Sequence, residues 1–300
     1  MTANWKHYLL LNLIVFIWGF TGVLGKEISL EALEIVFFRM GIAYLSMVLL
    51  YPFYKVRKVS LKHATLFFGT GVIVGIHWLT FFYAIKISTI SVAVVCMSSS
   101  TLFTAFLEPL FFKRKISINE LFLSIAIVIG IGLIMGFEPE YKMGILVGLI
   151  SAFLAASFNT INGKFIQKNY PTFQITKYEM LGGLATITAL LAFTNGLNKG
   201  LFIVSAEDWI LLTVLGVICT TLAFLASVWL LKFLTPFTVT MSINMEPIYA
   251  ILIALVIGYV RGSDSEKMSG GFYVGTLIIL GAIFLNAYLK KRRKKVANFS

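Results

Sequence analysis

An acidic residue inside an apolar stretch is the most informative chemical feature of this sequence. Glu246 stands between Met245 and Pro247, near the middle of an apolar segment that covers residues 236–260. An ionisable group at that depth in a bilayer costs on the order of 3 kcal/mol, so it normally faces a cavity or a partner. Glu246 could therefore exchange protons or bind an amine. Alternatively, it could bond to backbone groups released by Pro247, which lacks the N–H that a continuous helix needs.

Other ionisable groups lie in apolar segments as well. His77 could bind a substrate or carry protons, and the four-residue spacing places it on one helical face with Phe81; a histidine bonded across helices is the alternative. Arg39 could bind a carboxylate, but we expect a structural ion pair or a side chain that reaches the membrane surface. We expect Glu108 to lie at that surface, and Glu179 could lie there too.

Hydroxyl, amide and aromatic side chains at similar depth complete a candidate binding site. Amides and hydroxyls can replace the hydration of a zwitterion without the cost of full charges, although singly each could serve to join helices. The predicted substrate-binding set is Trp18, Thr21, His77, Trp78, Phe81, Ser99, Ser100, Phe158, Asn159, Asn162, Trp229, Ser242, Asn244 and Glu246. Glu246 is also the candidate coupling residue. The pattern indicates no catalytic residue, metal site or cofactor.

The composition restricts the class of protein that could carry this site. Of the 300 residues, 59% are hydrophobic and 13% are charged, against about 25% charged in soluble domains. The mean hydropathy is +0.91. These values exclude a disordered chain, a coiled coil and an ordinary soluble enzyme, and they predict a helical protein that spans a membrane many times. The two cysteines, Cys96 and Cys219, lie in apolar runs and imply no disulfide framework.

Ten segments are long and apolar enough to cross a bilayer as helices, which takes about 20 residues each. They cover residues 8–25, 33–52, 64–85, 90–112, 117–137, 143–163, 174–194, 208–231, 236–260 and 272–289. With the N-terminus in the cytoplasm, 18 of the 25 Lys and Arg residues fall on the cytoplasmic side and six on the other. The positive-inside rule therefore places both termini in the cytoplasm. The net charge of +12 then reports orientation and lipid contact, with no nucleic-acid partner.

An internal repeat divides the segments into two sets of five. Ala84-Ile85-Lys86 aligns with Leu230-Leu231-Lys232, and Ser100 to Phe103 then falls on Glu246 to Tyr249. Earlier in each half, Gly25-Lys26 aligns with Gly163-Lys164, Phe20 with Phe158, and Arg39-Met40 with Glu179-Met180. Because five is odd, the second half enters the membrane inverted. Inverted repeats of this kind are typical of secondary transporters, whose substrate site lies near the midplane.

We therefore expect an all-α integral membrane protein with ten transmembrane helices arranged as two inverted five-helix repeats. The first repeat would cover residues 1–137 and the second residues 138–290, followed by a basic cytoplasmic tail at 291–300.

The sequence resembles the EamA family of the drug/metabolite transporter superfamily over residues 8–290. The similar features are Trp18-Gly19, the segment from Ala84-Ile85-Lys86 to Ser100-Thr101-Leu102-Phe103-Thr104, and that from Leu230-Leu231-Lys232 to Met245-Glu246-Pro247-Ile248-Tyr249. The resemblance implies export of small polar metabolites, amino acids or related compounds, across the cytoplasmic (inner) membrane. Its partners would be the substrate, the lipid bilayer and, if transport is coupled, protons. A monomer is compatible with the sequence.

Three other hypotheses remain open, and the first is a purely structural membrane scaffold, in which Glu246 would cost energy without use. An uncoupled facilitator would have the same fold and substrates, but a proton gradient would not drive accumulation. An intramembrane enzyme would need a nucleophile beside a base, and the residues available for that are Ser98 to Ser100 with His77.

Overall fold

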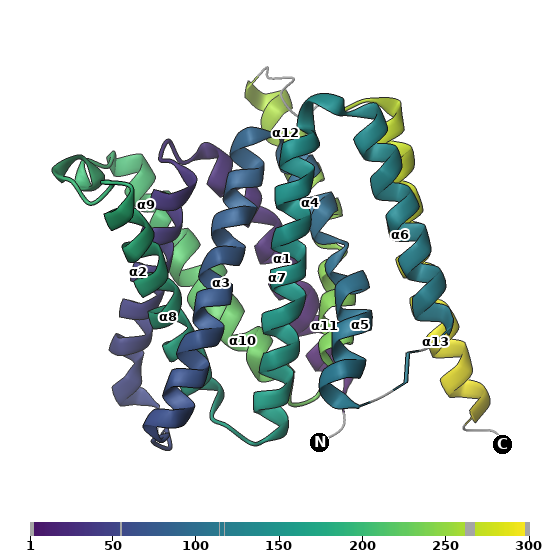
Figure 1. The fold of residues 1–300 in the computed structure, drawn as a ribbon, viewed down its shortest axis with the longest axis horizontal. Coiled ribbons are helices and arrows are strands. Elements are labelled where there is room, and N and C mark those ends of the chain that lie inside the picture. The colour runs from purple at the N-terminus through teal and green to yellow at the C-terminus, as the bar shows by residue number, and fades with distance from the viewer. Residues whose placement is uncertain (1–2, 55, 114, 117, 262–267, 298–300) are drawn as a thin grey trace.

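The chain folds into a bundle of helices (Figure 1). The computed structural model describes residues 3–54, 56–113, 115–116, 118–261 and 268–297, and the regular secondary structure in these ranges is helical. The α-helices are α1 (Trp5–Glu27), α2 (Ala32–Leu50), α3 (Leu61–Ile87), α4 (Ile90–Met97), α5 (Ser100–Phe112), α6 (Ile118–Phe137), α7 (Lys142–Gln167), α8 (Thr172–Phe193), α9 (Ala206–Gly216), α10 (Ala223–Leu230), α11 (Pro236–Ile243), α12 (Glu246–Arg261) and α13 (Gly270–Ala297). Short elements are η1 (Tyr51–Phe53), η2 (Pro139–Tyr141), η3 (Lys199–Phe202) and the π-helical turn η4 (Val217–Leu222).

These elements form ten rods within the described ranges, one for each predicted segment. Three rods are interrupted: α4 with α5, α9 with η4 and α10, and α11 with α12. Seven rods are long and apolar enough to cross a bilayer along their described residues, and α6 and α13 contribute shorter apolar stretches. The predicted fold class, an all-α membrane protein with ten helices in two inverted sets of five, is confirmed. The division into repeats at residues 137 and 138 stays a prediction, as does a separate tail at 291–300, where α13 continues as far as Ala297 and 298–300 lie outside the described residues.

The two halves break their helices at positions related by the predicted repeat. Helix α4 begins after Thr89, whose side chain accepts a hydrogen bond from the N–H three residues later, and it ends at Ser98. Helix α11 begins after Thr235, which caps its helix in the same way, and it ends at Asn244. Both pairs of positions are separated by the same offset as the aligned lysines Lys86 and Lys232. Similar local sequences therefore produce a capped half-helix and a break in each half.

Helices of one half pack on helices of the other. Helix α1 packs along α12 and α7 along α5, which is the exchange expected if the repeat relates α1 to α7 and α5 to α12. Helix α3 packs on α7 and α8, and α2 packs on α8, α9 and η4. Helices α6 and α13, the last of each half, lie side by side at one edge of the bundle (Figure 1). The halves are thus interlocked, and the space between them lies inside the bundle.

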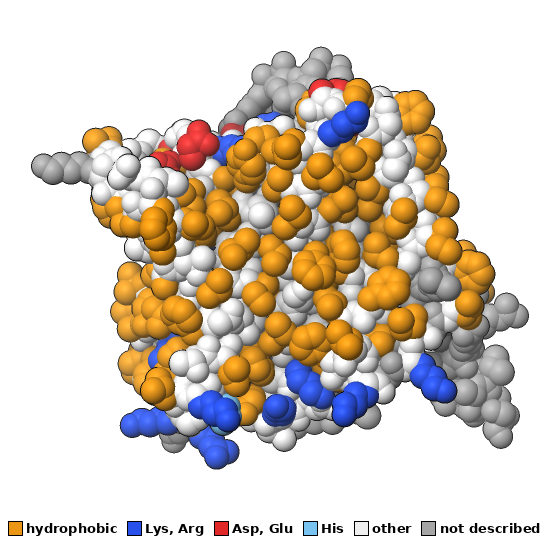
Figure 2. Space-filling view, in the orientation of Figure 1, with side chains coloured by type: hydrophobic (Ala, Val, Ile, Leu, Met, Phe, Trp, Pro, Cys, Tyr) orange, Lys and Arg blue, Asp and Glu red, His pale blue; other side chains and the backbone are white. Residues whose placement is uncertain are grey.

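The surface has the charge distribution of a protein that spans a bilayer. Both ends of the chain lie at the same end of the bundle (Figure 1). In the face shown in Figure 2, hydrophobic side chains cover the middle, most Lys and Arg side chains gather at the end that holds the termini, and acidic side chains lie at the other end. An apolar belt between two polar ends is the surface that a hydrocarbon layer requires.

Helices α3 and α8 approach so closely that backbone contacts backbone. A Cβ added at Gly71 would lie 2.2 Å from the carbonyl oxygen of Glu179, and one added at Gly182 would lie 2.1 Å from that of Phe68. At Gly75 the nearest atom would be the Cα of Gly183, at 2.9 Å. Small residues allow this approach, which replaces the hydrophobic effect as the main source of packing energy between helices in lipid. Gly71 and Gly75, one helical turn apart, therefore allow the close packing at this crossing.

We expect Gly71→Ala to lower the melting temperature of the detergent-solubilised protein, because the new methyl group would push α3 away from α8. Overpacking of this kind costs about 1–3 kcal/mol. Gly69→Ala, on the same helix with nothing within 4 Å of its added Cβ, is the matched control and should leave the melting temperature unchanged or raise it slightly. Equal melting temperatures for the two variants would contradict the close crossing.

Candidate functional site

A cavity lies between the two halves, bounded by α1, α2, α3, α4, α7, α10, α11 and α12. Its empty volume is about 670 Å³, open solvent at its mouth included. Eight of its lining residues belong to the predicted set: Trp18, Thr21, His77, Trp78, Phe81, Phe158, Asn159 and Glu246. Eight others do not: Arg39, Met97, Ala155, Phe224, Ser227, Val239, Thr240 and Ile243.

Two of the remaining predicted residues join the broken helices. The side-chain amide of Asn244 donates to the hydroxyl of Thr101 at 2.7 Å and to the carbonyl oxygens of Thr240 and Met241. The Ser99 hydroxyl donates to the Cys96 carbonyl at 2.5 Å. These groups satisfy backbone atoms at the breaks, as polar side chains do where a helix is interrupted at membrane depth.

The other four predicted residues also lie away from the cavity lining. The Ser242 hydroxyl donates to the Thr238 carbonyl one turn earlier. Ser100 and Asn162 are buried, with exposed fractions of 0% and 1%. Trp229 packs against Phe233 near the end of the bundle that holds the termini. The structure thus brings eight of the predicted residues together at one cavity and places six elsewhere.

Arg39 contributes a positive charge to the cavity, and the expectation of an ion pair or a surface position for it is wrong. The residue is 2% exposed, its Nε donates to the Thr220 hydroxyl at 2.7 Å, and its guanidinium carbon lies 3.9 Å from the centre of the Trp78 ring. Among the described residues, no carboxylate lies within 4 Å of the guanidinium, and its Nη1 has no acceptor. Arg39 is therefore a buried cation held by a hydroxyl and an aromatic face.

The π-helical turn η4 positions two of the cavity residues. Thr220 and Thr221 each donate to the carbonyl five residues earlier, Leu215 and Gly216, at 2.7 and 2.9 Å. The same turn presents the Cys219 carbonyl to the Trp18 indole N–H at 3.1 Å and the Thr220 hydroxyl to Arg39. A π-helical turn widens the helix and frequently occurs at functional sites. The sequence analysis missed this turn, and the adjacent threonines in an apolar segment are the signal that could have drawn attention to it.

Glu246 is the first residue of α12, directly after the break from α11. It is 6% exposed and lines the cavity. Within the described part of the chain, its carboxylate makes no hydrogen bond or ion pair, so the alternative that it bonds to backbone released by Pro247 finds no support there. The partial positive charge at a helix N-terminus favours a carboxylate in this position. Arg39 and Glu246 thus line one cavity, and among the described residues they form no ion pair.

His77 is fixed by hydrogen bonds between α3 and α7. Its Nδ1 lies 2.9 Å from both the carbonyl oxygen and the hydroxyl of Ser151, and the hydroxyl donates back to the His77 carbonyl at 3.0 Å. A carbonyl oxygen can only accept, so these partners assign the proton to Nδ1 and leave Nε2 of the neutral ring as an acceptor. The ring also stacks on Phe81 at 6.4 Å between centroids, as the four-residue spacing predicts.

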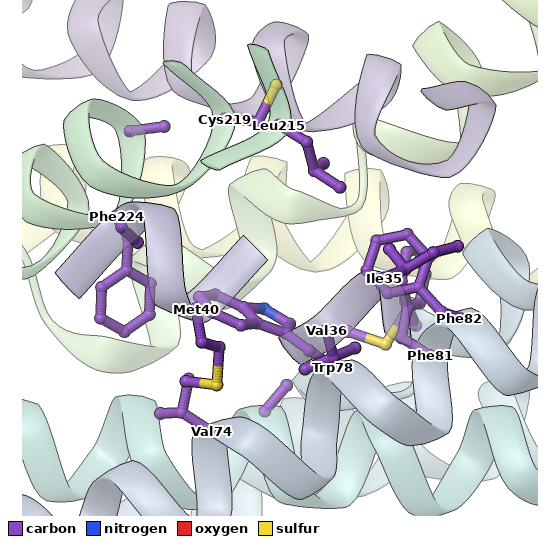
Figure 3. Close-up of a cluster of buried hydrophobic side chains, with 14 of the residues drawn as sticks. Ile35, Val36, Met40, Val74, Trp78, Phe81, Phe82, Leu215, Cys219 and Phe224 are labelled. Carbon is purple, nitrogen blue, oxygen red and sulfur yellow. The ribbon is translucent and has the colours of Figure 1, made fainter. Parts of the chain in front are cut away.

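Aromatic rings form an apolar wall beside these polar groups. Phe224 packs against Trp78 and Phe158, each at 5.7 Å between ring centroids, and Phe158 packs against His77 at 5.4 Å. Figure 3 shows Trp78 and Phe224 within the buried cluster that continues to Phe81. An apolar wall with a few polar groups is the usual composition of a small-molecule site.

The lining residues extend toward both ends of the bundle. Ser227, which lines the cavity, lies one turn before the end of α10, and Phe81 lies almost two turns before the end of α3. At the end of the bundle opposite the termini, the loop between α1 and α2 is closed against α9, because the Ser29 N–H and hydroxyl both donate to Asp208. Lys86 adds a bond to the Ile28 carbonyl at 2.8 Å.

Two carboxylates expected near the membrane surface are buried instead. Glu108 is 6% exposed and accepts a hydrogen bond from the Phe237 N–H at 3.1 Å, so it caps the N-terminus of α11 from α5. Glu179 is 0% exposed and lies at the close crossing of α3 and α8. Among the described residues, no group of three or more His, Cys, Asp or Glu side chains is arranged to hold a metal ion.

Comparison with known proteins identifies the family of this fold. The model of the EamA-like transporter family matches residues 5–136 and 142–288, and the chain belongs to that family. It is 24% identical to each of two Bacillus subtilis (strain 168) proteins named as uncharacterized transporters: YdfC, over 95% of this chain and 96% of the relative, and YxxF, over 83% and 80%. A crystal structure that is 13% identical superposes with a TM-score of 0.67 over 96% of this chain and 99% of that chain, which supports the fold. The protein is thus a multi-pass membrane transporter.

We expect Ser227→Cys to react with a water-soluble thiol reagent, because this position lines the cavity. Ser99→Cys, fully buried at the break between α4 and α5, is the matched control and should react at least about tenfold more slowly, since thiol reactivity follows access to solvent. The wild-type protein, with its two buried cysteines, supplies the background. Equal labelling of both variants, measured by mass spectrometry, would contradict a hydrated cavity at Ser227.

Proposed function

We propose that this member of the EamA-like family is a secondary transporter that moves a small amine-bearing metabolite, an amino acid or a related compound, by alternating access. The observation that carries the proposal is the position of Glu246. This carboxylate stands at a helix break in the middle of the bundle, lines the cavity and has no hydrogen-bond or ion-pair partner among the described residues. A buried charge without a partner is costly, and a positively charged group of a bound substrate, or a proton, would relieve that cost.

The direction we propose is export across the cytoplasmic membrane with both termini in the cytoplasm. Support comes from the excess of Lys and Arg at the end of the bundle that holds the termini. The cavity lining extends toward this same end as well as toward the other, where the Ser29–Asp208 contact closes the loop between α1 and α2 against α9. A substrate would therefore enter from the cytoplasm and leave after the two halves rock about the site. One chain encloses the whole cavity, so a monomer suffices for this cycle.

Glu246 would also couple transport to protons by exchanging its proton for the substrate amine. An uncoupled facilitator would use the same cavity with no proton exchange, and a proton gradient distinguishes the two. The enzyme alternative has weaker support, because His77 bonds to Ser151 and, among the described residues, makes no hydrogen bond to Ser98, Ser99 or Ser100.

We expect Glu246→Gln to reduce efflux of the transported compound from proteoliposomes at least about tenfold, because a charged hydrogen bond contributes about 1.5–3 kcal/mol. The measurement uses purified protein with a panel of amino acids and related amines inside the vesicles, with and without a pH gradient. We expect the gradient to drive wild-type efflux uphill and to have no effect on the variant.

The matched control is Glu140→Gln, which removes an exposed carboxylate from η2 and should leave transport unchanged. Equal efflux and equal pH dependence in wild-type protein and Glu246→Gln would refute the role of Glu246. Downhill flux by the wild-type protein that ignores the gradient would favour the facilitator.

A further inference from the structure

We propose that Arg39 is the specificity-determining residue of the cavity and binds an anionic group, foremost a carboxylate, on the substrate. The inference rests on the proposed function, since it places a second recognition group opposite Glu246. It restricts the substrate to compounds that carry a negative group as well as an amine and excludes simple amines.

Arg39 has hydrogen-bond partners for only part of its guanidinium group. A guanidinium carries five N–H groups in one plane. Here the hydroxyl of Thr220 takes the Nε–H at 2.7 Å, and the ring of Trp78 covers one face at 3.9 Å. Among the described residues, no acceptor is bonded to Nη1 or Nη2, and Nη1 is fully enclosed. The edge of the guanidinium that suits a two-oxygen acceptor is therefore the edge that the protein leaves unpaired.

The arrangement of Arg39 is energetically unfavourable in the absence of a ligand. An arginine buried without a counter-ion is costly, and proteins normally pair such a group. Glu246 is the acidic residue that lines the same cavity, and its carboxylate lies beyond ion-pair distance from Arg39. The two charges are kept apart by separate supports, because Arg39 is bound to η4 and Glu246 begins α12. A ligand with a negative and a positive end would satisfy both at once.

The guanidinium of Arg39 is held in a fixed orientation. Thr220 belongs to the π-helical turn, and its hydroxyl is itself held by the Leu215 carbonyl at 2.7 Å. Trp78 is held in turn by Phe224. A flexible surface arginine would lack such supports. Preorganised donors bind an anion without paying again for side-chain order, which is the arrangement expected of a recognition group.

The apolar wall defines the remainder of the ligand. Trp78 and Phe224 lie beside Arg39, and Phe158 continues the wall toward His77. A compound fits this lining if its charged groups face Arg39 and Glu246 and its apolar or aromatic side chain packs against the wall. Phenylalanine and two derivatives that each lack one charged group are therefore suitable probes.

The test measures binding and transport of phenylalanine, of phenethylamine, which lacks the carboxylate, and of 3-phenylpropionate, which lacks the amine. Binding is followed by quenching of tryptophan fluorescence in the purified protein, and flux is measured in proteoliposomes. We expect the wild-type protein to prefer phenylalanine to phenethylamine at least about tenfold, because an unpaired buried donor penalises a ligand that lacks the acceptor. The same three-way comparison is applied to the other amino acids and their matched amines and acids.

We expect Arg39→Gln to remove this preference. The substitution should weaken the binding of phenylalanine at least about tenfold and change the binding of phenethylamine little, because the amine contacts Glu246. Arg39→Lys keeps the charge but loses the planar guanidinium and its contact with the Trp78 ring. Its preference for phenylalanine over phenethylamine should therefore lie between those of the wild-type protein and Arg39→Gln. Arg57→Gln, at an exposed position, is the matched control and should behave as wild type. Gel filtration and thermal melting establish that each variant is folded.

If Arg39→Gln does not fold, Thr220→Val takes its place, because this change removes the Nε acceptor and leaves the arginine present. Thr220→Val should weaken the binding of ligands that carry a carboxylate and leave the binding of phenethylamine unchanged. If a folded variant loses affinity for phenylalanine and phenethylamine equally, so that the ratio of the two affinities is unchanged, the role of Arg39 is structural and the proposal is overturned.

Two further outcomes separate the proposals. A wild-type protein that moves amines as well as amino acids, and depends on Glu246 for both, would overturn the Arg39 proposal and leave the proposed function standing. A wild-type protein that neither binds nor moves any member of the panel would count against both.

Discussion

Backbone groups released at a helix break inside a bilayer must find partners within the protein or its cavity, because the hydrocarbon chains of the lipid offer none. This requirement organises the centre of the molecule. The break between α4 and α5 and the break between α11 and α12 lie against each other, and Asn244 and Thr101 join them at 2.7 Å. Side-chain hydroxyls and amides thereby satisfy the interrupted ladders. The helix that restarts at Glu246 is free to present its first carboxylate to the space between the halves.

A second irregularity completes the opposite wall of the cavity. In η4 the hydroxyls of Thr220 and Thr221 bond to carbonyls five residues back, and the widened turn gives Arg39 and Trp18 their acceptors. The two charged groups of the cavity therefore both depend on departures from regular α-helix, one a break and the other a π-helical turn. A bundle of unbroken apolar helices would have neither the polar supports nor the room for them.

The sequence was sufficient for the fold and for the approximate depth of the site. Apolar length predicted the ten rods, and the internal alignment predicted their arrangement in two inverted sets of five. Which side of a helix faces the cavity could not be predicted, because lipid and protein interior are both apolar and the hydrophobic pattern does not distinguish them. The environments expected for Arg39, Glu108 and Glu179 were wrong for that reason. The sequence predicts how far along its helix each residue lies, but it does not predict whether the side chain faces the interior of the protein. The consecutive residues Ser99 and Ser100 were assigned together to the lining although neither reaches it.

The repeat also shows where the two halves have diverged. Arg39 and Glu179 occupy aligned positions on α2 and α8, and both are buried. Arg39 faces the cavity, whereas Glu179 lies beside the crossing with α3, where its backbone oxygen contacts Gly71. Because Arg39 lines the cavity and its aligned counterpart does not, the cavity is electrostatically asymmetric although the helices that form it are related by symmetry. Inversion of the fold therefore does not make the inward and outward halves of a cycle chemically equivalent.

The glycine crossing of α3 and α8 has a mechanical consequence. Where backbones touch with no side chains between them, helices cannot slide without collision, and no rotamer change can absorb the displacement. Helices α3 and α8 should therefore move together as one rigid body, together with His77 and Trp78 on α3. Any rearrangement that exposes the cavity to the other side must then take place at helix–helix interfaces that are packed through side chains, such as those of α1 and α7 with their partners.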